Sequence, residues 1–359
     1  MQGKINFQNE AGFSLVEMVV ALGVMIIVTA SIVSLMKGSM NISTANYELT
    51  DAQQSLRTAQ EYINRDLMNA GDGLKTLSVI RLPQTFINNY LTLTPIVDTD
   101  MPAGTINFGI LTSDNQVPAG TTVLGTSPSV TVRSSPSLTD RQTIIEVDPQ
   151  FIAIPPTTIN SSGTLVTLPS GTNMAQFTVG EIYFFSSSLG STFSVVTAIS
   201  TANRQLTFNS GDSPLAVNAS GTANNLKIIS SSGTTATSMT RMRMIHYYVN
   251  SSGFLMRRVF GAKCVPSTTC TGFTENVVAE HVVNVQFNYS LDMTDSAGNV
   301  VQPTNALSTK SERLGIRQVE VTVTVETPHA LQSGNKSQLS MTTSTSVRNM
   351  QFRRAQQPS

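Results

Sequence analysis

The sequence predicts an α+β fold in which a long amino-terminal helix packs on an antiparallel β-sheet head with an inserted β-rich subdomain. Three observations predict it. Residues 18–36 carry no charge, and residues 41–70 keep a helical spacing of apolar side chains. Beyond Leu74, β-branched and aromatic stretches alternate with turns rich in Gly, Ser, Asn and Pro.

The composition narrows the classes of protein to which the chain can belong. It has 359 residues, and its 22 Lys and Arg balance its 22 Asp and Glu, so the formal net charge is zero. A nucleic-acid-binding domain would show a basic face or a pI above about 9, so no nucleic-acid partner is expected. A hydrophobic share of 40% with a mean hydropathy of +0.03 excludes a polytopic membrane protein and a disordered chain.

The first apolar segment runs for 19 uncharged residues, from Met18 to Met36, and ends at Lys37. A helix of this length spans the roughly 30 Å hydrocarbon core of a membrane. A secretory signal would be shorter and would end in a small-residue cleavage site, which the sequence after Met36 lacks. Glu17 places a carboxylate just inside the apolar block, where a charge needs a partner. The alternative is an interfacial Glu17 in a plain signal anchor.

The helix is predicted to continue beyond the membrane span, because residues 41–70 contain no Pro. Apolar or small residues follow one another at intervals of three and four, as on one face of a helix, at Ile42, Ala45, Leu49, Ala52, Leu56, Ala59 and Ile63. Gly71-Asp72-Gly73 forms a stop signal. One helix from Phe13 to Ala70 is therefore expected, with a short juxtamembrane coiled coil as the alternative.

The remaining sequence predicts two groups of strands. The first covers residues 105–111, 142–147, 164–168, 182–186, 193–199 and 205–208, and the second covers residues 242–249, 254–260, 282–289, 318–326 and 338–346. Valines alternate with polar residues in the stretch 318–326, at Val319, Val321, Val323 and Val325, which indicates a strand with one buried and one solvent-exposed face. The expected division is a leader over 1–12, helix halves over 13–36 and 37–72, an inserted β-rich subdomain over 73–240 and a carboxy-terminal sheet over 241–359.

The segment Gly12-Phe13-Ser14-Leu15-Val16-Glu17 resembles the class III signal of type IV prepilins and type II secretion pseudopilins. The resemblance implies that a prepilin peptidase cleaves after Gly12 and N-methylates the new first residue, Phe13. It also implies that the apolar helix stays in the mature chain. The methylated amine of Phe13 would pair with Glu17 of a neighbouring subunit during assembly, in a low-dielectric layer where charge pairs are strong.

Two further matches restrict the resemblance to one type of minor pilin. Arg65-Asp66-Leu67-Met68-Asn69-Ala70-Gly71 is similar to a segment of PilW-type minor pilins, and minor pseudopilins of the GspJ type have a related segment, usually without the Ala-Gly. The alternative for this segment is a solvated pair of neighbouring charges before a glycine cap. In the carboxy-terminal region, the order of short motifs also resembles the PilW type: Tyr248-Val249, Leu255 to Arg258, Val282 to Tyr289, Ile316 to Val325, and Ser346 to Asn349.

The resemblance implies a minor pilin, a structural and assembly subunit near the pilus tip. Its implied partners are the prepilin peptidase, other minor and major pilins, the inner-membrane assembly platform and, through one helix, the membrane. It would be a bacterial single-pass inner-membrane protein with a periplasmic head that later enters an extracellular pilus. A GspJ-like pseudopilin is the nearest alternative. A bitopic surface adhesin with a coincidental motif and an anchored hydrolase are alternatives of other classes.

The sequence contains no recognised catalytic motif, and neither a cofactor nor an enzymatic activity is expected. Cys264 and Cys270 enclose five residues, and a disulfide across this loop is expected in an oxidising compartment, with two buried thiols or half of a metal site as alternatives. His246 and His281 lie in strand-like sequence and are expected to be structural or surface residues. Two acidic loops, 98–100 and 292–299, are interpreted as turns, with calcium binding as the alternative. No metal ligands are therefore assigned.

Overall fold

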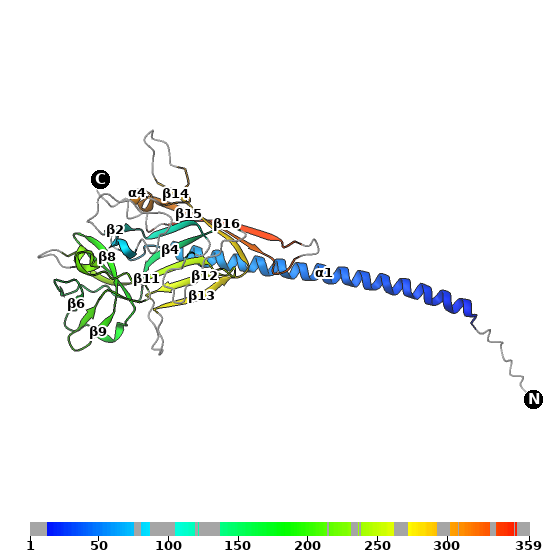
Figure 1. The fold of residues 1–359 in the computed structure, drawn as a ribbon, viewed down its shortest axis with the longest axis horizontal. Helices are drawn as coiled ribbons and strands as arrows, with labels where there is room; N and C mark the ends of the chain where they lie inside the picture. Colours follow the sequence, from blue (N-terminus) through cyan, green and yellow to red (C-terminus); the bar gives the residue numbers. More distant parts are fainter. Residues whose placement is uncertain are drawn as a thin grey trace, which may run out of the picture.

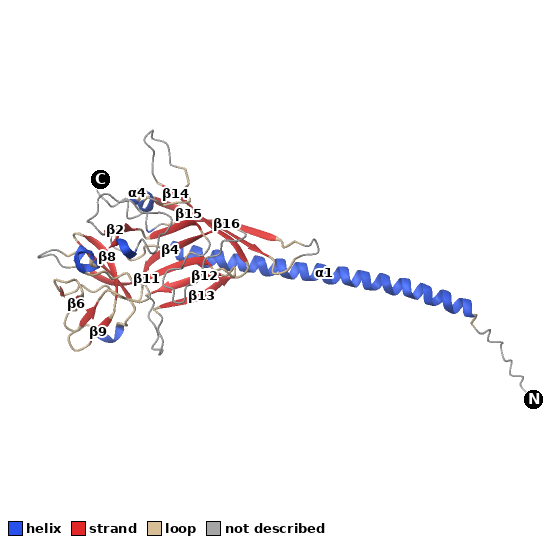
Figure 2. Cartoon of the chain, in the orientation of Figure 1, coloured by secondary structure: helices blue, strands red, loops and turns tan. Residues whose placement is uncertain are grey.

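One long helix extends away from a β-rich head in the computed structural model (Figure 1). The structure describes residues 13–74, 80–86, 105–118, 121, 137–213, 215–230, 236, 238–261, 272–292, 302–307, 309–330, 335–347 and 349. Figure 2 shows that strands make up most of the head around the last turns of the helix. This arrangement confirms the α+β expectation in its broad form.

Helix α1 (Leu15–Met68) is continuous over 54 residues, close to the predicted span. Its end is fixed by two glycines with left-handed backbone, Gly71 with φ +72° and Gly73 with φ +71°. The Gly71 N–H donates to the Ile145 carbonyl at 2.8 Å. A Cβ on Gly73 would lie 2.9 Å from Val147 Cβ, so glycine is required where the helix end turns onto the sheet.

The largest sheet has nine strands and is mixed. Strand β11 is the longest and pairs with β7 over one part of its length and with β4 over another. Strand β1 pairs with β8 in parallel, whereas the other pairs between described strands are antiparallel. The strands are β1 (Ile80–Pro83), β2 (Thr105–Phe108), β3 (Leu111–Val117), β4 (Thr139–Val147), β7 (Ile182–Ser187), β8 (Gly190–Val195), β11 (Ser238–Val249), β12 (Leu255–Phe260) and β13 (Phe273–Ala279).

Two smaller sheets complete the described part of the head. One consists of β5 (Thr158–Ile159), β6 (Leu165–Thr167), β10 (Gln205–Thr207) and β9 (Ala198–Ser200), in that order, and the other of β14 (Val282–Leu291), β15 (Ile316–Glu326) and β16 (Gln338–Ser346). The short helices are η1 (Met174–Gln176), η2 (Gly221–Ala223), α3 (Asn225–Ile228) and α4 (Lys310–Leu314).

The second half of α1 packs against β13, β15 and β16. The predicted apolar stripe is confirmed from Ala52 onward, because Ala52, Leu56, Ala59 and Ile63 are all buried in the main core. The beginning of the stripe is not buried. Ile42 is 62% exposed, since this part of α1 extends beyond the head.

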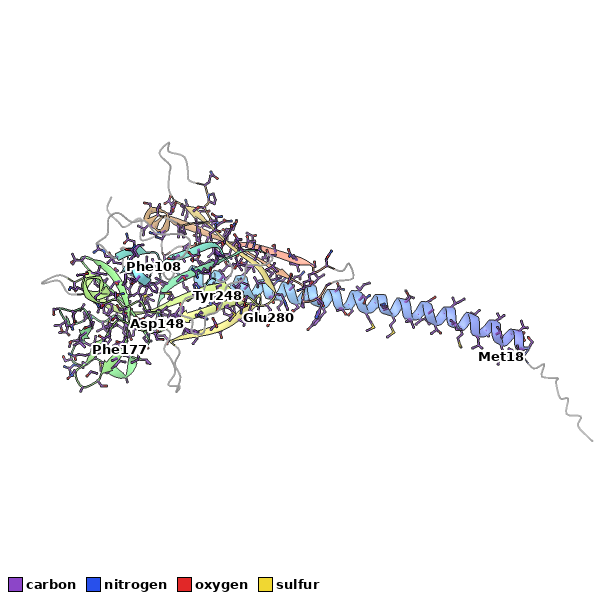
Figure 3. All side chains as sticks on the ribbon, viewed as in Figure 1. Met18, Phe108, Asp148, Phe177, Tyr248 and Glu280 are labelled. Atoms are coloured by element: carbon purple, nitrogen blue, oxygen red, sulfur yellow. The ribbon has the colours of Figure 1, made fainter. Side chains whose placement is uncertain are left out.

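A second core lies between the β7–β8 hairpin and the four-stranded sheet, at the end of the head farthest from the amino terminus (Figure 1). Aromatic rings fill it in edge-to-face contacts, for example Phe151 with Tyr183 and Phe185 with Phe208 at 5.4 Å between ring centroids. We call the part of the chain around this core, residues 148–236, the distal module. Figure 3 labels Phe177 within it and Phe108 in the main core.

Most predicted strands lie within a few residues of observed ones. The stretch 105–111 is divided between β2 and β3, and 193–199 is divided between β8 and β9. Strand β13 was not predicted, because Thr274, Glu275 and Asn276 interrupt its apolar pattern. Residue 240, the predicted end of the inserted subdomain, lies inside β11, and the nine-stranded sheet combines strands from both sides of it.

A buried carboxylate connects the nine-stranded sheet to the three-stranded one. Asp140 of β4 is 1% exposed, and its two oxygens accept the backbone N–H groups of Gln116 and Phe287, each at 2.8 Å. Burial raises the pKa of Asp140 to about 6, against the lowering effect of the two backbone hydrogen bonds. The folded chain therefore holds a proton there between about pH 4 and 6, a range in which an unfolded Asp is ionised.

This proton predicts a defined pH dependence of stability. Folding takes up a proton between the ordinary pKa of 3.8 and the raised one of about 6, so Asp140 favours the folded state less as the pH rises through that window. The stability advantage of the wild type over Asp140→Asn should shrink by about 2 kcal/mol from pH 4 to pH 6. Urea unfolding of the full chain in detergent measures it. Asp51→Asn, at an exposed carboxylate of α1, should leave the curve unchanged. An advantage that stays constant or grows would contradict the prediction.

Candidate functional site

The amino-terminal end of α1 is a self-contained cap. Ser14 is the N-cap residue, and its hydroxyl accepts the Glu17 N–H at 3.2 Å. The Glu17 side chain reaches back and accepts the Ser14 N–H at 3.0 Å, which completes a capping box. In the isolated chain, therefore, the carboxylate already has one hydrogen-bond partner, and it adds the negative charge that a helix amino terminus favours.

The first half of α1 exposes a continuous apolar surface. Phe13 is 85% exposed, and the apolar side chains along residues 15–36 are exposed in the same way, as Figure 3 shows around Met18. The most apolar 18-residue window has a mean hydropathy of 2.6, and none of it is buried. This helix is long and apolar enough to cross a membrane, and among the described residues it is the one helix that meets this condition. An apolar surface of this extent requires an apolar environment.

The structure describes some of the predicted site residues and not others. Phe13 and Glu17 lie at the exposed start of α1, four residues apart, as the helix prediction requires. Gly12 and the rest of the leader lie outside the described residues, and so do Cys264 and Cys270. Cleavage, methylation, subunit pairing and the disulfide therefore stay predictions.

Asp66 forms the polar centre of the contact between α1 and the sheet. Its Oδ2 accepts a hydrogen bond from the Tyr247 hydroxyl and another from Arg257 Nε, both at 2.6 Å. Asp66 is 2% exposed, so the interpretation of Arg65 and Asp66 as a solvated pair is wrong for Asp66. Arg65 stays exposed, 3.5 Å from Asp66 Oδ1. Two of the segments on which the resemblance was based, 65–71 and 255–258, thus meet at this carboxylate.

The charges and hydrogen-bond donors around Asp66 suit a carboxylate. Burial raises the pKa of Tyr247, and the Asp66 carboxylate raises it further, so the phenol stays a donor. Burial alone would lower the pKa of Arg257, but the hydrogen bond and charge of Asp66 raise it. A buried carboxylate that holds a cation and a neutral donor resists separation, because either partner alone would leave a polar group unsatisfied.

Three further hydrogen bonds from polar side chains extend the helix contact toward β16 and the chain end. Gln60 Nε2 donates to the Met341 carbonyl at 2.9 Å, and Thr345 donates to Asn64 Oδ1 at 2.7 Å. Asn349 Nδ2 donates to the Met68 carbonyl at 3.3 Å, one of the carbonyls left free at the end of α1. These bonds hold the helix to the sheet edge from Gln60 to its last residue, Met68.

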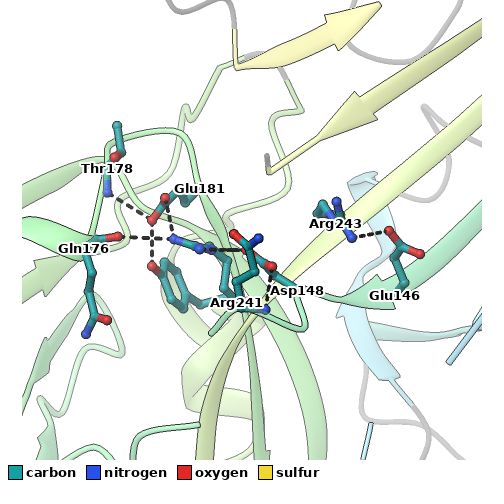
Figure 4. A network of polar contacts seen from close by, with 9 residues as sticks. Glu146, Asp148, Gln176, Thr178, Glu181, Arg241 and Arg243 are labelled. Carbon is teal, nitrogen blue, oxygen red and sulfur yellow. Dashed lines mark hydrogen bonds and ion pairs between the residues drawn. The ribbon is translucent and has the colours of Figure 1, made fainter. Parts of the chain in front are cut away.

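A second cluster of buried charges joins the distal module to β11, as Figure 4 shows. Arg241 donates to Asp148 at 2.7 Å and to Glu181 at 3.0 Å, and the Tyr183 hydroxyl donates to Glu181 at 2.6 Å. Burial raises the pKa of Glu181, while its hydrogen bonds oppose that effect. Nearby, Arg243 pairs with Glu146 at 2.8 Å. Each carboxylate in this cluster pairs with an arginine, so the arrangement serves to join elements of the fold.

The histidines do not converge. His246 is buried in β11 with Nδ1 at 2.8 Å from the Thr143 hydroxyl, and burial, with the charges of Arg141 and Arg258, lowers its pKa well below the usual range. His281 lies in the turn after β13, not in a strand, with φ +55°. In the described part of the chain, no three His, Cys, Asp or Glu side chains gather as a metal site would need. Residues 98–100 and 293–299 of the acidic loops lie outside that part.

Comparison with protein-family models, with curated proteins and with solved structures found no match to this chain. The long amino-terminal apolar helix followed by a β-rich head is consistent with a pilin-like architecture.

The Asp66 contact predicts a large loss of stability on substitution. Asp66→Ala leaves the fully buried Tyr247 and the largely buried Arg257 without their acceptor, and it should lower the free energy of unfolding by about 3–5 kcal/mol. Thermal or urea unfolding of the full chain in detergent measures this. Glu61→Ala, at an exposed carboxylate on the same helix, is the matched control and should change stability by less than about 0.5 kcal/mol. Equal effects of the two substitutions would show that the contact is not a major source of stability.

Proposed function

We propose that this protein is a minor pilin of the PilW type, a structural and assembly subunit near the tip of a type IV pilus. The observation that carries the proposal is the form of α1. It begins two residues after Phe13, holds Glu17 in its first turn, exposes its apolar half completely and buries one face of the other half against a β-rich head. Such a helix can pass from a membrane into a bundle of similar helices without a change in its own fold.

The proposed mechanism is an exchange of partners at Glu17. In the single chain, Ser14 N–H is the group that satisfies the carboxylate. In a bundle, the methylated amine of Phe13 of a neighbouring subunit supplies a full positive charge in a layer of low dielectric, where opposite charges attract more strongly than in water. A subunit out of register would bury an unpaired charge, which is costly. The pair thereby sets the axial position of the helix.

The prepilin peptidase, other minor and major pilins and the inner-membrane assembly platform are the partners that this proposal requires. The subunit would first cross the inner membrane once, with its head in the periplasm, and then enter the pilus. The turn at Gly71 supports the PilW type over the GspJ type. The GspJ type usually lacks the Ala70-Gly71 pair, and in this chain Gly71 ends the helix contact with a turn. Gly71 turns the chain onto β4 with a left-handed backbone.

Mass analysis of the amino terminus tests the proposal. The chain isolated from native membranes should begin at Phe13 and carry one added methyl group. In cells that lack the prepilin peptidase, it should begin at or near Met1. A chain that keeps residues 1–12 in cells with a working peptidase would overturn the proposal in favour of a bitopic surface adhesin. A processed chain that is recovered with the type II secretion machinery and not with pili would replace it with a pseudopilin.

The pairing role of Glu17 gives a separate prediction. Glu17→Gln keeps a side-chain oxygen that can accept the Ser14 N–H, but it removes the charge. Processing should continue, whereas the amount of chain recovered in sheared pili relative to the membrane pool should fall at least about tenfold, equivalent to about 1.4 kcal/mol. Asp51→Asn, at an exposed carboxylate in the second half of α1, should assemble normally. Normal recovery of Glu17→Gln in pili would refute the pairing role.

A further inference from the structure

Glu48 marks the point at which α1 enters the head. It is 6% exposed, and none of the described residues before it, 13–47, is buried. Its Oε1 lies 2.9 Å from His329 Nδ1. Its Oε2 is also buried and has no hydrogen-bond partner within the described part of the chain. The carboxylate therefore depends on one histidine at the membrane-facing end of the helix–head contact.

His329 lies just after β15, where a network of hydrogen bonds positions it. The Thr327 hydroxyl donates to the His329 carbonyl at 2.9 Å and accepts the Ser337 N–H at 3.0 Å. Thr327 is fully buried, so the backbone that carries His329 is fixed to the strand pair. The imidazole itself is 82% exposed, which leaves it free to exchange protons with solvent.

Among the described residues, the elements that meet here carry few other charged side chains. Glu326 and Lys336 pair with each other at 3.0 Å. On α1 the nearest exposed charge in sequence is Asp51, and the turn after β13 carries Glu280 and His281. A half-satisfied buried carboxylate costs free energy. A charged imidazolium offsets that cost better than a neutral imidazole, because a charge-assisted hydrogen bond is the stronger of the two.

We propose that the Glu48–His329 pair is a pH-sensitive clamp that fixes where α1 leaves the head. When His329 is protonated, the clamp is closed and the packed part of the helix begins at Glu48. As the pH rises and the imidazolium loses its proton, the clamp weakens and residues 48–56 open from the head more often. The free part of α1 then lengthens at the expense of the docked part. The inference rests on the helix–head contact alone and does not depend on the proposed function.

Hydrogen exchange on the full chain in lipid nanodiscs tests the clamp. After correction for the intrinsic pH dependence of exchange, opening of residues 49–56 should be about two- to fivefold less frequent at pH 5.5 than at pH 7.5, the range of an exposed ion pair. His329→Asn and Glu48→Gln should each remove this difference. His281→Asn is the matched control and should keep it, since Asn tolerates the left-handed backbone at that turn.

Protection of the β15 amides from exchange reports whether the head of each variant is folded. If the head of His329→Asn is not folded, the Glu48→Gln variant alone tests the clamp. Loss of the pH difference in the folded variants, with retention in His281→Asn, supports the clamp. The clamp would be overturned if the wild type showed no difference in opening between the two pH values. It would also be overturned if a folded His329→Asn variant kept that difference, or if His281→Asn lost it.

Discussion

The Asp66 carboxylate is buried where α1 meets the sheet, and Arg257 and Tyr247 both donate hydrogen bonds to it there. The remaining architecture depends on this contact. The first half of α1 has no contact with the head, so the direction in which it projects is set only by how firmly the second half is held. Apolar packing by Leu56 and Ile63 would allow the helix to slide or rotate, but a buried ion pair requires one register.

Other carboxylates act in a similar way at two further boundaries between parts of the fold. Asp140 accepts backbone N–H groups from β14 and from the bulge in β3, which aligns the three-stranded sheet with the nine-stranded one. Glu181 and Asp148 hold Arg241 of β11 and so join the distal module to the nine-stranded sheet. Each boundary between layers thus contains a charged group whose partners lie on both sides. This pattern explains how a chain with only 12% charged residues buries so many of them.

The sequence was sufficient to predict what depends on local pattern. The α1 span follows from the absence of Pro and the spacing of Ala52, Leu56, Ala59 and Ile63. Contacts between distant segments were less accessible. Asp66 continues that spacing, three residues after Ile63 and four before Ala70, so its position on the buried face was visible, but its charge favoured a solvent-exposed interpretation. Its partners come from β11 and β12, about 180 residues later, and no local pattern identifies them. Strand β13 was missed for a related reason, because Glu275 is paired with Arg258 across the sheet.

The two halves of α1 need different surroundings. The first half needs an apolar environment, and the second half packs on the head. An exposed apolar helix of this length would draw the protein into aggregates unless a membrane or other helices cover it. The head does not cover this surface, because its packed contact with α1 begins at Glu48, 35 residues after Phe13. The second half is instead rich in groups that bond to the head, such as Gln60, Asn64 and Asp66. The second half of α1 is therefore tied to the sheets by side-chain hydrogen bonds and a salt bridge as well as by apolar packing, and these contacts fix the direction in which the first half projects.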